Sequence, residues 1–302
     1  MKTCVLSLVR QGSGLGMLAV AALPAFAQTP GPLTNPSFEI PRSGSVLNIP
    51  RGWTNAGDTN EVKRRYVGDG LQPPIQPVGT PNAITPRTGE ALVEIRAPGD
   101  GGFRSVNTDI VNTTLPTFPF YDPFFDWEGG SVRVGVWYLI PANAPLEGGG
   151  EAAVKLNVKF GNQDYATSDP WGETGLFVGA GTTNGEWRFA EYLWTRTAIR
   201  REVFFNEAQG FFVLPPFPDH FKIVVGYWGR GFAGDTGTIY YDDVFFEQYA
   251  AADFNADGQC DFFDYLDFAS AFGNEEEPAD FNGDGQVDFF DYLDFAQAFG
   301  AC

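Results

Sequence analysis

Apolar and polar residues alternate in several segments between residues 90 and 246. The alternation is clearest in residues 131–140, where Val132, Val134 and Val136 fall on one face and Trp137 on the other. A period of two is the pattern of a β-strand with one buried face. Similar runs predict further strands at residues 90–95, 103–110, 153–160, 187–194, 221–228 and 238–246.

Turn-forming residues separate these runs. The chain is rich in them, with 37 Gly and 22 Pro. Short strands between such turns are typical of a two-sheet β-sandwich. Residues 72–86 contain too much Pro for a central strand, so we expect a loop there. Gly229, Gly231 and Gly234 form a G-x-G-x-x-G pattern, but a strand follows it where phosphate binding requires a helix. We interpret this pattern as a hairpin loop.

The first 27 residues have the layout of a secretory signal peptide. Lys2 and Arg10 come before a short apolar stretch, and Ala25 and Ala27 form a small-x-small cleavage site. No later segment approaches the roughly 20 apolar residues of a membrane-spanning helix. We therefore expect an exported chain with three parts: a leader (1–27), a β-sandwich (28–249, "the sandwich") and a C-terminal module (250–302, "the tail").

The net charge argues against a nucleic-acid partner. The formal charge is −19, and loss of Lys2 and Arg10 with the leader changes it to −21. Nucleic-acid binding depends on neutralising phosphates with Lys and Arg. Residues 251–302 contain 13 of the 38 acidic residues and no Lys or Arg. Such a segment repels itself unless cations bind it.

Several kinds of catalytic site are excluded by the residues present. His220 is the only histidine, which rules out H-E-x-x-H zinc sites, and no G-x-S-x-G pattern follows the leader. Paired carboxylates for glycoside hydrolysis remain open, because the two residues need only meet in space. The sequence selects no pair among Glu128, Glu173, Glu186 and Glu191.

Two motifs give the sandwich a family resemblance: LTNPSFE at residues 33–39 with Gly52-Trp53, and GTIYYDDVFFE at residues 237–247. With the segments GEALVEI and GSVRVGVWYLI, they resemble the galactose-binding-like jelly rolls of carbohydrate-binding modules. The resemblance implies a structural Ca²⁺ held where the first and last strands meet. The matching residues here are Glu39, Asp242 and, less closely matched, Asp243. The alternative is that the two aspartates merely end a strand at the surface.

Sugar binding by such a domain requires exposed aromatic rings with polar side chains beside them. The outward positions of the predicted strands contain two tryptophans, Trp137 and Trp228. Their polar companions would be Lys155, Asn157 and Arg188. A second aromatic set lies in loops, at Tyr121, Trp127 and Trp171. For any single tryptophan a core position is the favoured alternative, because so aromatic a chain buries many rings, and we expect it for Trp53 and Trp187.

The tail consists of two copies of one segment, residues 253–273 and 280–300, which are identical at 18 of 21 positions. Both copies fit D-x-N-x-D-G-x-x-D-x-x-D, whose oxygen atoms are spaced to surround one Ca²⁺, with a glycine for the sharp turn. Positions 1, 3, 5, 7, 9 and 12 are Asp253, Asn255, Asp257, Gln259, Asp261 and Asp264 in the first loop, and Asp280, Asn282, Asp284, Gln286, Asp288 and Asp291 in the second. We expect two calcium ions in the tail, with a third in the sandwich if the resemblance above holds.

Two loop-and-helix units at a 27-residue period resemble a dockerin, the small module that joins secreted proteins to cohesin partners. The tail looks most similar to the variant dockerin-like tails that end in or near Gly-Cys and are found on many exported bacterial proteins. Positions 10 and 11, which read the partner in dockerins, are Phe262-Phe263 and Phe289-Phe290 here, whereas small hydroxylated residues are usual. This difference puts a cohesin of the familiar kind in doubt and leaves another envelope or surface protein open. The four phenylalanines are either the core of the module or its partner contact.

The helices of the tail are expected at residues 265–272 and 292–299. If the two copies pack as a pseudo-two-fold pair, the end of the second helix lies beside the first loop. Cys302 would then lie close to Cys260, and an exported chain would join them in a disulfide.

These features predict an exported, non-catalytic, carbohydrate-binding β-sandwich attached to a partner or to the cell surface through a calcium-dependent, dockerin-like tail. One alternative is a secreted glycoside hydrolase or lyase that acts on polysaccharide. Another is a surface structural protein without a glycan ligand.

Overall fold

The computed structural model describes residues 33, 35–42, 49–56, 61–111, 129–160, 163–166, 175–177, 181–197, 220–229, 231 and 233–302. The predicted leader lies outside these residues, and so do Glu128, Glu173 and the loop aromatics Tyr121, Trp127 and Trp171.

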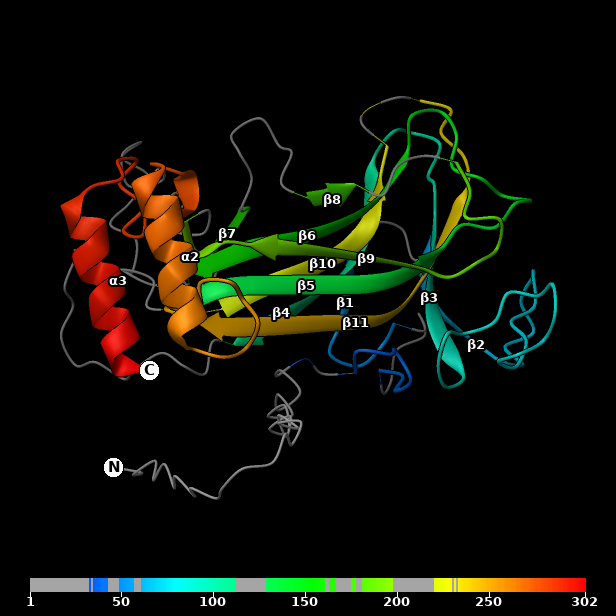
Figure 1. The fold of residues 1–302 in the computed structure, drawn as a ribbon. Helices are drawn as coiled ribbons and strands as arrows, with labels where there is room; N and C mark the ends of the chain where they lie inside the picture. Colours follow the sequence, from blue (N-terminus) through cyan, green and yellow to red (C-terminus); the bar gives the residue numbers. More distant parts are fainter. Residues whose placement is uncertain are drawn as a thin grey trace, which may run out of the picture.

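The sandwich consists of two antiparallel sheets (Figure 1). The first has the order β1 (Thr54–Ala56), β4 (Phe103–Val111), β10 (His220–Trp228), β6 (Glu151–Phe160) and β7 (Gln163–Ala166), and β8 (Gly175–Phe177) also pairs with β6. The second has the order β2 (Val62–Tyr66), β3 (Ala91–Arg96), β11 (Thr238–Ala250), β5 (Gly129–Leu139) and β9 (Arg188–Trp194). The seven predicted strands are confirmed, and four short strands were missed.

One hydrophobic core fills the space between the sheets. It contains the predicted inward residues of both, such as Val134 and Val136 of β5 and Ile223 of β10. Trp53 is also in this core, as predicted, with 1% of its surface exposed. Its Nε1 donates a hydrogen bond to the Asn35 carbonyl at 3.3 Å. The alternation in the sequence therefore identified the buried face correctly.

The loops differ from the predictions in one respect. Residues 72–86 form a loop, as expected, and Ile75 and Ile84 pack against Leu92 and Tyr240 on the outer side of the second sheet. The glycine-rich segment after Trp228 is not a hairpin loop. It joins β10 to β11, which lie in different sheets and do not pair with each other. β10 pairs with β4 and β6, and β11 pairs with β3 and β5.

The tail contains two helices, α2 (Phe262–Gly273) and α3 (Phe289–Ala301), and a short 3₁₀ turn, η1 (Glu277–Ala279). The helices lie at one end of the sandwich (Figure 1). Both start three residues earlier than predicted, because Asp261 and Asp288 cap their N-termini through capping boxes with Asp264 and Asp291. Within the described residues, no helix has the length and apolar content that crossing a bilayer requires.

The two copies of the repeat pack as equivalent halves. Phe268 and Phe295 occupy the same position in each copy, and their rings stack with centroids 4.0 Å apart. Phe254 meets Phe268 edge-on at 5.6 Å, and its equivalent, Phe281, meets Phe295 in the same way at 5.5 Å. The predicted disulfide between Cys260 and Cys302 is present. The pseudo-two-fold packing from which we predicted it is therefore confirmed.

Candidate functional site

An aromatic strip, formed by Trp137, Phe189 and Phe245, lies on the outer face of the second sheet. Trp137 stands between core residues of β5 and is paired with Phe189 of β9. The ring centroids are 5.2 Å apart for Trp137 and Phe189, and 5.6 Å apart for Phe189 and the stacked Phe245. The Phe189 side chain is 41% exposed. The strip therefore offers ring surface to solvent.

Two features of the backbone form this strip. Phe245 lies across from Gly135, and a Cβ atom at Gly135 would come within 2.1 Å of the Phe245 ring, so the glycine makes room for that ring. A register shift in β11 between Asp242 and Phe245 turns Phe245 outward and Phe246 into the core. Such a bulge changes which residues face outward without ending the strand.

Arg87 borders the strip. Its guanidinium carbon lies 4.0 Å from the centroid of the Trp137 ring, within the range of a cation–π interaction. The same guanidinium forms an ion pair with Asp243. A fixed hydrogen-bond donor thus lies over one face of the Trp137 ring.

The residues predicted to bind sugar fall on two different sheets. Trp137 belongs to the strip, whereas Trp228, Lys155 and Asn157 belong to the first sheet. The Lys155 amine lies 3.9 Å from the Trp228 ring centroid, and burial lowers its pKa. Arg188 is exposed but pairs with the core residue Tyr138, so its strand position is not on the outward row. Phe189, and not Arg188, is thus the residue paired with Trp137, and sugar binding by Arg188 stays a prediction.

The predicted calcium residues of the sandwich already have other partners. The Glu39 carboxylate accepts hydrogen bonds from the N–H groups of Glu90 and Ala91 at 3.0–3.1 Å. Asp243 accepts from Ser37 Oγ at 2.6 Å, in addition to its ion pair with Arg87. The Arg87 guanidinium therefore supplies a positive charge at this point. Calcium binding by this set stays a prediction.

Asp242 is fully buried beside Asp243. Burial, and then the neighbouring Asp243 charge, raise the pKa of Asp242 to about 8. Three backbone N–H groups, those of Arg87, Thr88 and Asp243, donate to its carboxylate at 2.8–3.3 Å and partly offset this effect.

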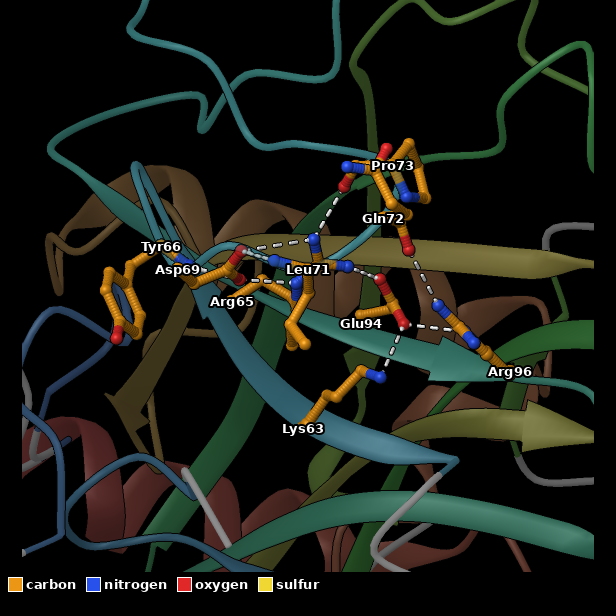
Figure 2. Close-up of polar contacts among 9 residues, drawn as sticks. All are labelled: Lys63, Arg65, Tyr66, Asp69, Leu71, Gln72, Pro73, Glu94 and Arg96. Atoms are coloured by element: carbon orange, nitrogen blue, oxygen red, sulfur yellow. Dashed lines mark hydrogen bonds and ion pairs between the residues drawn. The ribbon is translucent and has the colours of Figure 1, made fainter.

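A buried ion network that was not predicted lies between β2 and β3 (Figure 2). Glu94 and Arg65 have no exposed side-chain surface and form an ion pair. Lys63 and Arg96 also pair with Glu94, at 3.4 and 2.7 Å. Arg65 additionally donates to Asp69 at 2.5 Å and to the Pro73 carbonyl at 2.6 Å (Figure 2). These bonds fix the start of the 72–86 loop across the outer face of the sheet, which indicates a structural role.

The two predicted calcium loops of the tail have matching geometry. Asp253 and Asp280, at position 1, are 3% and 0% exposed, and each accepts a hydrogen bond from the position-6 glycine N–H, at 2.9 and 3.0 Å. Those glycines, Gly258 and Gly285, have φ angles of 86° and 92°. Asp264 and Asp291, at position 12, are fully buried and accept from position 3 at 3.1 and 2.9 Å. The loops therefore curl their carboxylates inward.

The donor set of the loops fits Ca²⁺, a hard cation that takes carboxylate, amide and carbonyl oxygens. Burial raises the pKa of Asp253 to about 6, with further contributions from the Asp264 and Asp257 charges. Burial likewise raises the pKa of Asp291, with contributions from Asp280 and Asp284. A bound dication would relieve this repulsion. In the described part of the chain, no group of three or more His, Cys, Asp or Glu side chains is arranged to hold a metal ion by itself. The calcium assignment stays a prediction that also requires the asparagine and carbonyl oxygens.

The four phenylalanines at positions 10 and 11 are not core residues. Phe262, Phe263, Phe289 and Phe290 are 63–64% exposed, and Leu266 and Leu293, one turn later, are 45% exposed. The core of the tail is built from other aromatic residues, among them Phe268, Phe281 and Phe295. Of the two interpretations of the sequence, only the surface position agrees with the structure.

Among known proteins, no family model and no curated protein matches this chain. Solved structures with a similar arrangement include the enzymatically active domain of bacteriophage CBA120 tailspike protein 4 (TM-score 0.38, 12% identity) and the arabinose-bound α-L-arabinofuranosidase MgGH51 (TM-score 0.38, 14% identity). Each match covers 72% of this chain, but only 21% and 26% of those proteins. The N-terminal cellulose-binding domain of Cellulomonas fimi β-1,4-glucanase C has a TM-score of 0.32 and 13% identity, with 67% of this chain and 92% of that one covered. At these scores the similarities assign neither a ligand nor an activity.

Proposed function

We propose that this protein is an exported, non-catalytic, carbohydrate-binding β-sandwich that is attached to a partner protein through its calcium-binding tail. The observation that carries the sugar-binding part is the aromatic strip on the outer face of the second sheet. Its rings lie side by side on paired strands, Phe189 is open to solvent, and the Arg87 guanidinium lies over the Trp137 ring. Rings stack on the C–H faces of pyranoses, and a guanidinium donates to hydroxyl groups.

Affinity electrophoresis of the full-length protein in gels containing soluble polysaccharides tests this assignment. Trp137→Ala and Phe189→Ala should each lower the affinity for polysaccharide about tenfold, since each removes one ring of the strip. The loss appears as a smaller retardation in the gel. Tyr66→Ala is the matched control, because Tyr66 is also exposed and also lies under an arginine, Arg64, at 5.2 Å. Equal retardation of the wild type and all three variants would count against the strip as a sugar site. The absence of retardation of the wild type by every polysaccharide would do the same.

The attachment part of the proposal rests on the exposed phenylalanine pairs of the tail. An apolar surface of this kind on a soluble module marks an interaction site. Residues 251–302 contain 13 acidic and no basic residues, so the fitting partner has an apolar surface with Lys or Arg around it.

A pull-down from the envelope fraction of the parent organism tests the attachment. Full-length protein should capture a partner in calcium and release it in EGTA, and the variant Phe262→Ser/Phe289→Ser should capture none. Leu71→Ser is the control, since Leu71 is 40% exposed in the sandwich. Capture that persists in EGTA, or in the phenylalanine variant, would exclude this mode of attachment.

A further inference from the structure

The tail is joined directly to the sandwich. β11 ends at Ala250, and position 1 of the first loop is Asp253, so only Ala251 and Ala252 lie between them. The Asp253 N–H donates back to the Ala250 carbonyl at 3.2 Å, and both intervening alanines pack with the tail core. Two packed residues leave no room for a linker of the kind that lets modules move independently.

The second calcium loop is held by a residue of the sandwich that follows β9. Thr197 is 1% exposed, and its hydroxyl lies 3.0 Å from the carbonyl oxygen of Asp280, position 1 of that loop. The Pro278 carbonyl, just before the loop, lies 3.2 Å from the same hydroxyl. Thr197 thus fixes the backbone at the point where the loop begins.

Arg196 contacts position 2 of the same loop. Its Nε donates to the Phe281 carbonyl at 3.4 Å, and its guanidinium carbon lies 4.4 Å from the centroid of the Phe281 ring. Phe281 is 2% exposed and belongs to the tail core. Since residues 251–302 contain no Lys or Arg, this guanidinium is a positive charge that the sandwich supplies to the tail.

The first loop is held from a different strand. Arg133 of β5 donates from Nη2 to the carbonyl of Ala256, position 4 of the first loop, at 3.1 Å. Ala256 has a φ angle of 57°, a left-handed conformation that favours glycine and is held at some cost by a non-glycine residue. The Arg133 guanidinium is itself fixed by the Tyr249 ring, at 5.3 Å, and by Glu247, at 3.9 Å.

We propose that Thr197, Arg196 and Arg133 are positioning residues for the calcium loops, so that calcium binding in the tail and the stability of the sandwich are coupled. The inference rests on the proposed calcium-binding role of the tail. Groups that orient the ligands of a metal contribute to its affinity even without touching it. Coupling is reciprocal: if the sandwich contacts strengthen calcium binding, calcium must stabilise the sandwich contacts by the same factor.

Calcium titration calorimetry of the full-length protein tests the positioning role. Thr197→Val, which keeps the side-chain shape and removes the hydroxyl, should weaken one of the two tail sites about tenfold. Thr197→Ser should restore it, and Arg133→Met should weaken the other site. Thr80→Val is the matched control, since the Thr80 hydroxyl also donates to a carbonyl, that of Pro77, in a loop of the sandwich. Wild-type affinities in both Thr197→Val and Arg133→Met would overturn the inference.

Thermal unfolding followed by tryptophan fluorescence tests the coupling itself, because all 7 tryptophans lie before residue 251 and report only on the sandwich. Calcium at 100 times its dissociation constant should raise the sandwich transition by about 5 °C in wild type and less in Thr197→Val. A transition that calcium leaves unchanged, while calorimetry shows two ions bound, would overturn the coupling and leave the proposed function intact. A wild-type protein that binds no calcium would instead refute the proposed function of the tail, and this inference with it.

Discussion

The sandwich and the tail both bury carboxylates, but they balance the charges differently. In the sandwich, the fully buried Glu94 meets Arg65, Lys63 and Arg96. In the tail, Asp253 and its equivalents at positions 1 and 12 are buried in a segment that contains no Lys or Arg. These carboxylates accept hydrogen bonds from backbone N–H groups, which reduce but do not cancel the repulsion between the carboxylates.

This difference has a consequence for folding. For Glu94, the sandwich supplies the compensating cations from its own sequence. The tail has no Lys or Arg of its own, so under the proposed calcium role its cation comes from solution. Its stacked core of Phe268 and Phe295 lies against the loops that this cation would close. The tail should therefore fold with its ligand, while the sandwich should fold without one.

Removing calcium should have the largest effect. In EGTA we expect the circular dichroism signal of α2 and α3 to be lost, because the loop carboxylates then repel one another without compensation. The sandwich should stay folded at 25 °C, as its tryptophan fluorescence would report. Far-UV and fluorescence spectra of one sample, before and after EGTA and again after calcium is restored, check both halves of this prediction. Helical signal that survives EGTA would remove the distinction between the two regions.

The next largest effect is a dependence of the stability of the sandwich on pH. The folded-state pKa of Asp242 is about 8, whereas an unfolded aspartate titrates near 3.8. The folded state therefore holds a proton that the unfolded state has lost, so the free energy of unfolding should fall as the pH rises from about 4 to about 8. At about 1.4 kcal/mol per pKa unit, the fall is on the order of 5 kcal/mol. Denaturant unfolding at several pH values, with Asp242→Asn as the control that loses the slope, measures it.

The same titration tests the predicted calcium site in the sandwich. An ion bound by Asp242 would favour the carboxylate and remove the slope when calcium is present. A slope that is identical with and without calcium would argue against calcium binding by Glu39, Asp242 and Asp243.

Breaking the Arg65–Glu94 pair should destabilise the sandwich by about 3–5 kcal/mol, because Arg65→Met leaves Glu94 buried with less compensation. The double variant Arg65→Met/Glu94→Gln is the control and should recover part of the loss. Urea unfolding followed by tryptophan fluorescence gives both values. A change below about 1 kcal/mol in the single variant would show that Lys63 and Arg96 alone satisfy Glu94.

The disulfide should have a smaller effect, restricted to the tail. Under the chain-entropy account, the variant Cys260→Ser/Cys302→Ser should lower the stability of the calcium-loaded tail by about 2–4 kcal/mol. The sandwich transition should move by less than the tail transition. Calorimetry of the calcium-loaded protein separates the two transitions, and an equal shift in both would mean that the regions unfold as one unit.

The strands and their buried faces could be predicted because a local period of two determines them. The two tail loops could be located because their oxygen-bearing residues lie within one short segment that occurs twice, and calcium binding by them stays a prediction. The aromatic strip could not be predicted, because the outward position of Phe245 depends on the bulge after Asp242. A strict period of two from Tyr241 would place Phe245 on the inward face. The network around Glu94 depends on the pairing of β2 with β3, a long-range contact that leaves no local pattern.

The exposure of the four tail phenylalanines also needed the structure. Positions 10 and 11 follow each N-cap residue directly, and apolar residues there could face either the helix pair or solvent. Which face is buried is decided by the pairing of the two copies, in which Phe268 and Phe295 take the centre and Phe262 and Phe289 are left outside.

Native mass spectrometry of the full-length protein, purified with calcium and without reducing agent, tests the central claim most directly. The account predicts two calcium ions per chain, with Asp253→Ala and Asp280→Ala each removing one and the double variant removing both. A wild-type chain that holds no calcium, or whose calcium survives both substitutions, would contradict it.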